Sequence, residues 1–407
     1  ALRCIWDWFE RDNRARGLWR QQQANYEQHR PPRTRAETTQ QETKSIAAAV
    51  SRKLDAGQIS AAARLAYNQS APSPVTSEVI QQMTRAHPLR CENVPAVPES
   101  APLPSITLED FRTLTISQID GGKSGGTDAL RGAHLLPMLR DAEMGAILAR
   151  MCSHIACGTV PRDGKLGCNL TASRLVAISK KAVDAHGHQT ASFTQPPISL
   201  RPVAVAETLV RITGKILLLK LNKSPQPLCT LFPSIQYGLH PCGAERIIHS
   251  LQARWDEAAQ VSAPSACLCI DYSNAFNSIE RATVAEALYA TPRLKSIWRY
   301  FSWLYTQPSL LVMFQGEEIA AALWSSQGVR QGCVLGTLLF ALAAAREFQD
   351  HLEAIRRSEA RDDGEGIADV IRPAEAYAFC DDLNISGHPL HLLRGTSRQW
   401  SNPAHER

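Results

Sequence analysis

The sequence of 407 residues lacks a long apolar run. The longest stretch without Asp, Glu, Lys or Arg, residues 224–244, contains four prolines among many polar residues. A membrane-spanning helix needs about 20 predominantly apolar residues, so none is predicted. The sequence also lacks the charged, apolar and small-residue pattern of a signal peptide. Residue 1 is Ala rather than Met, which is expected of a fragment of a longer product.

Cysteine is present without the spacing of a disulfide scaffold or of common zinc sites. The chain has 11 Cys, an odd number, and no Cys-x-x-Cys pair. This usage, with no secretion signal, argues against an extracellular disulfide framework. The densest group of potential zinc ligands comprises Cys152, His154, Cys157 and Cys168, but no second close pair completes it. Small buried thiols are the favoured interpretation, and a zinc site is the alternative.

Composition lacks any extreme, but charge is unevenly distributed. Hydrophobic residues make up 44% and charged residues 20%, which excludes a disordered or fibrous chain. The net charge is +5. Between residues 160 and 225, however, ten Lys and Arg accompany three acids, giving 10 − 3 = +7. This basic block within a patterned segment favours a phosphate-facing surface, with a solvated face as the alternative.

The first half of the chain predicts helices, a linker and some strands. Residues 1–69 are expected to be largely helical, and seven prolines in residues 70–105 predict a linker. Helices are expected over residues 129–151 and 203–221, with strands and turns over residues 160–200.

The second half combines short strands with longer helices. Residues 266–271 predict a buried strand, and residues 310–322 and 375–386 predict hairpins. Helices are expected over residues 278–289, 294–305 and 335–352. Because strands and helices do not alternate regularly, the fold class is predicted to be α+β.

Three carboxylates occupy strand ends in this half. Asp271 ends the strand at 266–271, and Asp381 and Asp382 lie at the tip of the last hairpin. Adjacent carboxylates at an apolar strand tip repel each other unless a cation neutralises them. Mg²⁺ prefers one or two carboxylates with phosphates and water, and paired Mg²⁺ ions serve phosphoryl transfer. The pattern therefore predicts a divalent-metal site if the two strands are neighbours.

Several motifs, in a fixed order, resemble those of a known enzyme family. IDYSNAFNSI (270–279), SQGVRQGCVLGTLLFAL (326–342) and YAFCDDLNIS (377–386) resemble successive palm motifs of a reverse transcriptase of the non-LTR (LINE-type) retrotransposon class. Four upstream segments resemble the fingers and their N-terminal extension: 124–139, 154–181, 198–217 and 235–253. The resemblance covers about residues 50–387.

The resemblance implies a right-hand polymerase fold with fingers and a palm, in which an antiparallel sheet packs on helices. A helical N-terminal extension and linker are expected at residues 1–105, fingers at 106–260 and the palm at 261–390. Residues 391–407 do not resemble a palm continuation, so a truncated tail without a thumb is expected.

The resemblance also assigns roles to matching residues. Asp271 and Asp381 would bind two Mg²⁺ ions, with Mn²⁺ as a substitute; Asp382 lies beside them, and the carbonyl of Ile270 assists. Phe276 would exclude a ribose 2′-OH by steric contact, although a core aromatic is the alternative.

Further residues would hold the nucleotide and the template. Gln331 and Gly332 match a loop packed against the incoming nucleotide, with a simple helix-entry turn as the alternative. Arg201, with Lys180 or Lys181, matches basic fingers residues that hold the triphosphate or template, with a solvated turn as the alternative for Arg201. Arg330 stands where Pro is frequent.

The function implied is RNA-directed DNA polymerisation: extension of a DNA primer on an RNA template with deoxynucleoside triphosphates, in retrotransposition. A nuclear location and no membrane partner are expected. The alternative is a catalytically inactive, nucleic-acid-binding remnant, which the expected lack of a thumb favours. The presence of Asp271, Asp381 and Asp382 favours the enzyme.

Overall fold

The described part of the chain lies almost entirely within one compact unit. The computed structural model describes residue 51 and residues 73–90, 93–119, 125–179, 182–183, 189–190, 200–223, 226–232, 235–316, 318–360 and 372–400. The chain divides into two units, residues 1–72 and 73–407, and every described element belongs to the second. The helices expected within residues 1–69 therefore lie, apart from residue 51, outside the described residues.

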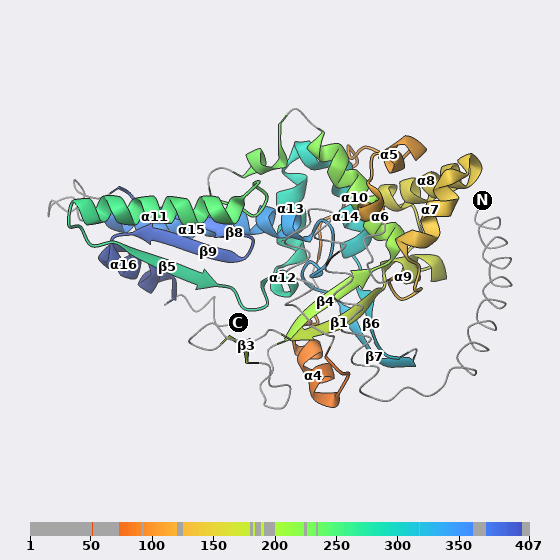
Figure 1. Ribbon diagram of the computed structural model, residues 1–407, viewed down its shortest axis with the longest axis horizontal. Coiled ribbons are helices and arrows are strands. Elements are labelled where there is room, and N and C mark those ends of the chain that lie inside the picture. Colours follow the sequence, from red (N-terminus) through yellow and green to blue (C-terminus); the bar gives the residue numbers. More distant parts are fainter. Residues whose placement is uncertain are drawn as a thin grey trace. The chain divides into compact units, whose positions relative to one another are not determined.

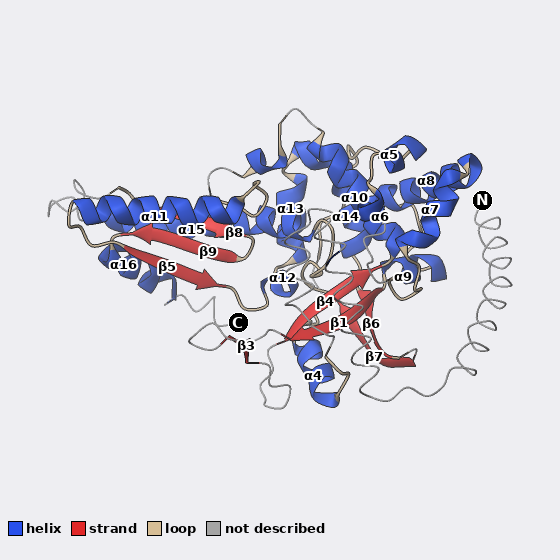
Figure 2. Cartoon of the chain, viewed as in Figure 1, coloured by secondary structure: helices blue, strands red, loops and turns tan. Residues whose placement is uncertain are grey.

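The elements form a mixture of helices and mostly antiparallel strands, which confirms the predicted α+β class (Figure 2). The helices are α4 (Ser77–Arg85), α5 (Leu108–Arg112), α6 (Ile116–Ile119), α7 (Gly132–Arg140), α8 (Ala142–Cys157), α9 (Lys165–Thr171), α10 (Thr208–Asn222), α11 (Gly243–Gln260), α12 (Ala275–Ser278), α13 (Arg281–Tyr289), α14 (Lys295–Tyr305), α15 (Gly336–Glu359) and α16 (Pro389–Trp400), with 3₁₀ turns η1 (Leu228–Leu231) and η2 (Pro292–Leu294). The strands are β1 (Ser173–Ser179), β2 (Ala182–Val183), β3 (Gln189–Thr190), β4 (Leu200–Ala206), β5 (Ala266–Asp271), β6 (Ser309–Gln315), β7 (Glu318–Ser325), β8 (Glu375–Phe379) and β9 (Asp382–Gly387).

A four-stranded sheet of order β4-β1-β6-β7 joins distant parts of the sequence (Figure 1). β1 runs antiparallel to β4 and parallel to β6, and β6 and β7 form the hairpin expected from residues 310–322. Helix α4 packs on this sheet because Val79 and Met83, one helical turn apart, are buried in its core. The prediction of a linker over residues 70–105 is therefore wrong for α4, which belongs to the folded unit.

A three-stranded antiparallel sheet of order β5-β9-β8 follows. Gly387 of β9 lies against Leu392 of α16, and Leu383 and Ile385, which share its face, are buried. On the opposite face, the guanidinium of Arg254 in α11 donates to the hydroxyl of Ser386. The expected hairpin at 375–386 is confirmed as β8 and β9, whereas β5 is a half-buried edge strand and not the buried strand predicted.

The basic block contains a strand where a helix was expected. Residues 200–206 form β4, and α10 begins only at Thr208. The alternation of larger and buried small residues in Val203–Ala206 suits a strand, and the apolar periodicity of a helix holds only beyond Glu207. The helix expected at residues 129–151 is likewise two helices, because Asp141 ends α7 and caps α8 by accepting from the Met144 amide.

Glu207, between β4 and α10, holds the loop before α7 through hydrogen bonds. Its side chain is 2% exposed and accepts from the amide and the hydroxyl of Thr127. Burial, followed by a hydrogen bond and charge from Asp128, raises the pKa of Glu207 to about 8. The carboxyl is therefore largely protonated at neutral pH, which removes the free-energy cost of burying a charge.

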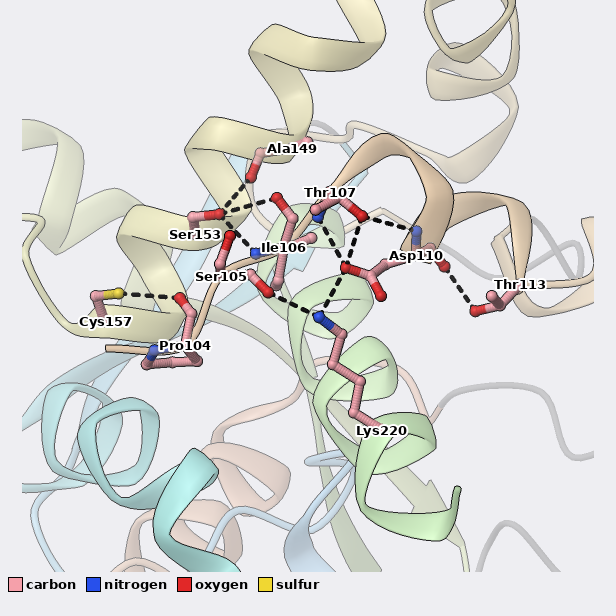
Figure 3. A network of polar contacts seen from close by, with 10 residues as sticks. All are labelled: Pro104, Ser105, Ile106, Thr107, Asp110, Thr113, Ala149, Ser153, Cys157 and Lys220. Atoms are coloured by element: carbon pink, nitrogen blue, oxygen red, sulfur yellow. Dashed lines mark hydrogen bonds and ion pairs between the residues drawn. The ribbon is translucent and has the colours of Figure 1, made fainter. Parts of the chain in front are cut away.

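A polar network ties residues 104–113 to α8 and α10 (Figure 3). Ser153 of α8 exchanges hydrogen bonds with the backbone of Ile106, at 2.9 and 3.1 Å. Lys220 of α10 donates to the carbonyl of Ser105 and pairs with Asp110, each at 2.7 Å. Asp110 also completes a capping box with Thr107 at the start of α5.

The four candidate zinc ligands have separate partners. Cys152 is fully buried, and burial raises the pKa of its thiol to about 12. The thiols of Cys157 and Cys168 donate to the carbonyls of Pro104 and Arg162, while His154 bonds the Thr159 hydroxyl. Of these three cysteines, only Cys152 is the buried thiol expected, because Cys157 is half-buried and Cys168 is exposed.

Each helix within the described ranges is too short or too polar to cross a membrane.

Candidate active site

The register of the three-stranded sheet brings the predicted acids together. Asp271, at the end of β5, lies directly opposite Asp382, the first residue of β9. Cys380 and Asp381 form the turn between β8 and β9. Asp382 and Ser386 lie on the same face of β9, the face that Arg254 of α11 contacts at its far end. Asp271 and Asp382 therefore lie at one end of the sheet, on the face opposite the one that contacts α16.

The three acids repel one another. The pKa of Asp382 is raised by partial burial, and then by the charges of Asp381 and Asp271; the charge of Arg201 acts in the opposite direction. Asp271 and Asp382 are exposed and Asp381 is half-buried. Such a cluster of carboxylates favours a bound cation or a bound proton.

Arg201 lies on the four-stranded sheet and acts on this cluster through its charge. It lies on β4 opposite Ile178 of β1, and its side chain is exposed. The charge of Arg201 lowers the pKa of Asp382, so the guanidinium on β4 lies within electrostatic range of the acids at the end of β5 and β9. Lys180 and Lys181, its expected partners, lie outside the described residues.

The loop that carries Gln331 and Gly332 packs on β4. The amide of Ala204 donates to the carbonyl of Gln331 at 2.7 Å. Gly332 has a φ of +108°, and a Cβ atom there would lie 2.6 Å from the carbonyl oxygen of Ala204. Glycine is thus required by contact with a strand, a reason beyond the substrate approach that the resemblance suggested.

Phe276 lies within the segment 270–279, on α12. Its ring, half-buried in α12, stacks on Phe340 of α15 with centroids 4.7 Å apart. Its carbonyl accepts from the Val329 amide at 2.7 Å. Phe276 therefore packs partly as a core aromatic and leaves part of its ring accessible.

Two buried arginines, Arg281 and Arg330, donate hydrogen bonds that fix the loop carrying Gln331 and Gly332 and the segment before it. Arg330 is 3% exposed and donates to the carbonyl of Thr171 and the hydroxyl of Ser173, so it joins the loop to β1. Both guanidinium groups lie 5.2 Å from the ring centroid of Tyr305. In the sequence, Arg330 stands out only as a departure from Pro, and Arg281, which follows Glu280 after the segment 270–279, carries no signal of its burial.

The oxygen donors suit a hard divalent cation. Asp271 and Asp382 face each other across adjacent strands, with Asp381 beside them. Within the described ranges, no set of three or more His, Cys, Asp or Glu is arranged to hold a metal ion by itself. Mg²⁺ is commonly bound by one or two carboxylates together with substrate phosphates and water. The mutual repulsion at Asp382 is the observation that fits such a cation.

A curated protein and a solved structure are similar to this chain. The chain is 23% identical over 288 residues to the retrotransposable element SLACS 132 kDa protein of Trypanosoma brucei gambiense. The matched region covers 71% of this chain and 21% of that protein. The chain thus spans about a fifth of the length of this curated relative.

A solved structure of apo telomerase from Candida tropicalis, truncated from its C-terminal domain, matches with a TM-score of 0.35 and 12% identity. That match covers 57% of this chain and 47% of the telomerase chain. Residues 180–391, just over half of the chain, match the reverse transcriptase (RNA-dependent DNA polymerase) family, and the chain belongs to that family.

Proposed function

We propose that the chain extends a DNA primer on an RNA template, as the polymerase part of a non-LTR retrotransposon protein. The observation that carries the proposal is the register that sets Asp271 opposite Asp382, next to Asp381, with Arg201 close enough for its charge to act on Asp382. Carboxylates beside an arginine match the needs of a reaction that brings a triphosphate to a metal site.

Asp271 and Asp381 would hold two divalent ions, with Ile270 contributing its carbonyl and Asp382 adding charge. Paired Mg²⁺ ions supply activation of the attacking hydroxyl and stabilisation of the leaving oxygen in phosphoryl transfer. Mn²⁺ offers similar oxygen coordination.

The chain's own residues orient the substrate. Arg201 would bind phosphate oxygens, for which a guanidinium is well suited. The Gln331–Gly332 loop, held on β4 through Ala204, would form a fixed wall for the incoming nucleotide. Because α12 and α15 both support the ring of Phe276, that ring would resist displacement by a ribose 2′-OH.

The relative from Trypanosoma brucei gambiense is a retrotransposable element protein, which supports a role for this chain in retrotransposition. The expected partners are an RNA template, a DNA primer and deoxynucleoside triphosphates, and a nuclear location follows from this proposal.

The direct test is primer extension by the purified chain on an RNA template with a DNA primer, in Mg²⁺ or Mn²⁺. An Asp381→Ala preparation, purified identically, controls for contaminating polymerase. Synthesis by the wild type alone supports the proposal. Absence of synthesis, with salt-sensitive RNA binding retained, contradicts it and favours the inactive nucleic-acid-binding remnant.

Phe276→Ala should admit ribonucleotides. Removal of the ring leaves space beside C2′, so discrimination between deoxynucleotides and ribonucleotides should fall by about 10- to 100-fold, as for other steric selections worth about 1–3 kcal/mol. Single-nucleotide insertion kinetics measure this ratio. Phe340→Leu tests whether loss of the stacking partner suffices, and unchanged discrimination in Phe276→Ala would refute the steric role.

A further inference from the structure

The segment before α11 runs beside the strand that leads into the catalytic turn. Gln236 and Ala378 of β8 form a parallel bridge. The Ala378 amide donates to the Ile235 carbonyl, and the Tyr237 amide donates to the Ala378 carbonyl, both at 2.7 Å. This pairing fixes residues 235–237 against β8, two residues before Cys380 in the turn.

The side chain of Gln236 then binds that turn directly. Its Nε2 donates to the carbonyl of Cys380 at 2.9 Å, and its Oε1 accepts from the Cys380 amide at 2.8 Å. Oε1 also accepts from the amide of Gly238 at 2.9 Å. Gln236 is 2% exposed, so water does not compete for these bonds. One buried amide thus satisfies both backbone polar groups of a single turn residue.

Cys380 needs such support because of its backbone conformation. Its φ is +58°, in the left-handed region that residues with a Cβ atom rarely adopt. Such conformations persist where the surroundings over-determine them. Gly238 adds to this restraint, since a Cβ atom there would lie 2.9 Å from both the amide nitrogen and the sulfur of Cys380.

We propose that Gln236 is a positioning residue for polymerisation: its amide holds Cys380 in the left-handed turn and thereby places the carboxylate of Asp381 beside the paired Asp271 and Asp382. The role rests on the proposed function, but the clamp itself does not. Asp381 follows Cys380 immediately, whereas Asp382 is paired with Asp271 across β5 and β9, so a change in the Cys380 dihedral angles moves the Asp381 carboxylate relative to that pair.

Hydrogen exchange tests the clamp without nucleic acid or metal. In Gln236→Met, which is similar in size but lacks the amide, protection of the Cys380 amide should fall at least about 10-fold; fragmentation mass spectrometry resolves this site. Gln327→Met is the matched control, because Gln327 is also buried and bonds the Ser278 carbonyl, away from the turn. It should leave Cys380 protection within twofold of the wild type.

Single-turnover insertion kinetics test the positioning. Misplacement of reacting groups by about 1 Å can cost about 100-fold in rate, so Gln236→Met should lower the insertion rate constant by about 10- to 100-fold. The nucleotide dissociation constant should change by less than about threefold. The insertion rate constant of Gln236→Glu, divided by that of the wild type, should rise as pH falls. Only a protonated, buried carboxyl can both donate to and accept from Cys380.

Each failure has a distinct result. Unchanged Cys380 exchange in Gln236→Met overturns the clamp, and a change confined to nucleotide affinity overturns the positioning role. An inactive wild type overturns the proposed function, while the exchange comparison still decides the clamp. If Gln236→Met does not fold, Gly238→Ala, which pushes on the same turn and keeps the amide, should give the same loss of rate; a wild-type rate there overturns the proposal.

Discussion

Asp271→Asn should lower the rate of nucleotide insertion by at least about 10³-fold, comparable to the loss of a major electrostatic group from an active site. The same substitution should stabilise the chain in the absence of divalent metal. The amide side chain is nearly isosteric with the carboxylate of Asp271 but carries no charge to repel Asp382, its partner across β5 and β9. Loss of activity with gain of stability is the signature of a site in which charges are held together for function.

The raised pKa of Asp382 makes the stability of the folded state depend on pH. Burial and the charges of Asp381 and Asp271 raise the pKa of Asp382 above its ordinary value of about 4. The protonated carboxyl therefore favours the folded state below that ordinary pKa, and this contribution is lost as pH rises through the raised pKa. The Asp271→Asn substitution removes one of the causes, so the variant should lose less stability over this range.

Thermal unfolding between pH 4 and 8, with chelator or with Mg²⁺, measures the difference in stability between the wild type and Asp271→Asn. Mg²⁺ should stabilise the wild type more than Asp271→Asn, because a ligand stabilises the state that binds it. Glu353→Gln, on the exposed surface of α15, serves as the control for removal of a carboxylate. Retained synthesis in Asp271→Asn, or lower stability than wild type in chelator, would contradict the assignment.

The sequence predicted the carboxylates because their chemistry is local. A strand that ends on an acid and a hairpin that carries two acids at its tip are patterns of consecutive residues. β5, β8 and β9 form over the expected residues, although β5 is half-buried rather than buried. The register that sets Asp271 opposite Asp382 is a long-range property. The order of the motifs indicated it only through resemblance to a family.

Long-range contacts explain what the sequence left out. Residues 200–206 form a strand because β1 provides a partner, although the following residues favour a helix. Val79 and Met83 lie in a proline-rich segment, and only the sheet beneath them shows that α4 is part of the core. Gln236 acts on Cys380, 144 residues later in the chain.

Arg281→Met should destabilise the folded unit by about 3–5 kcal/mol, in the range for loss of one partner of a buried charged network. Arg281 is 1% exposed on α13. Its guanidinium donates to the carbonyl of Gly328 at 2.9 Å, to the hydroxyl of Ser325 at 2.8 Å and to the carbonyl of Tyr305 at 3.1 Å. Methionine fills much of the volume but leaves these acceptors without their donors.

Arg281→Met should also loosen the loop that carries Gln331 and Gly332, because Arg281 binds the backbone of the segment before it. Arg281→Lys should recover little, since an ammonium group lacks the planar fork that reaches several carbonyls at once. Arg357→Met, at an exposed position of α15, should cost less than about 1 kcal/mol. Urea unfolding followed by tryptophan fluorescence measures all three variants. If Arg281→Met were as stable as Arg357→Met, the hydrogen bonds of the buried guanidinium would contribute nothing net, and the loop would be held by packing alone.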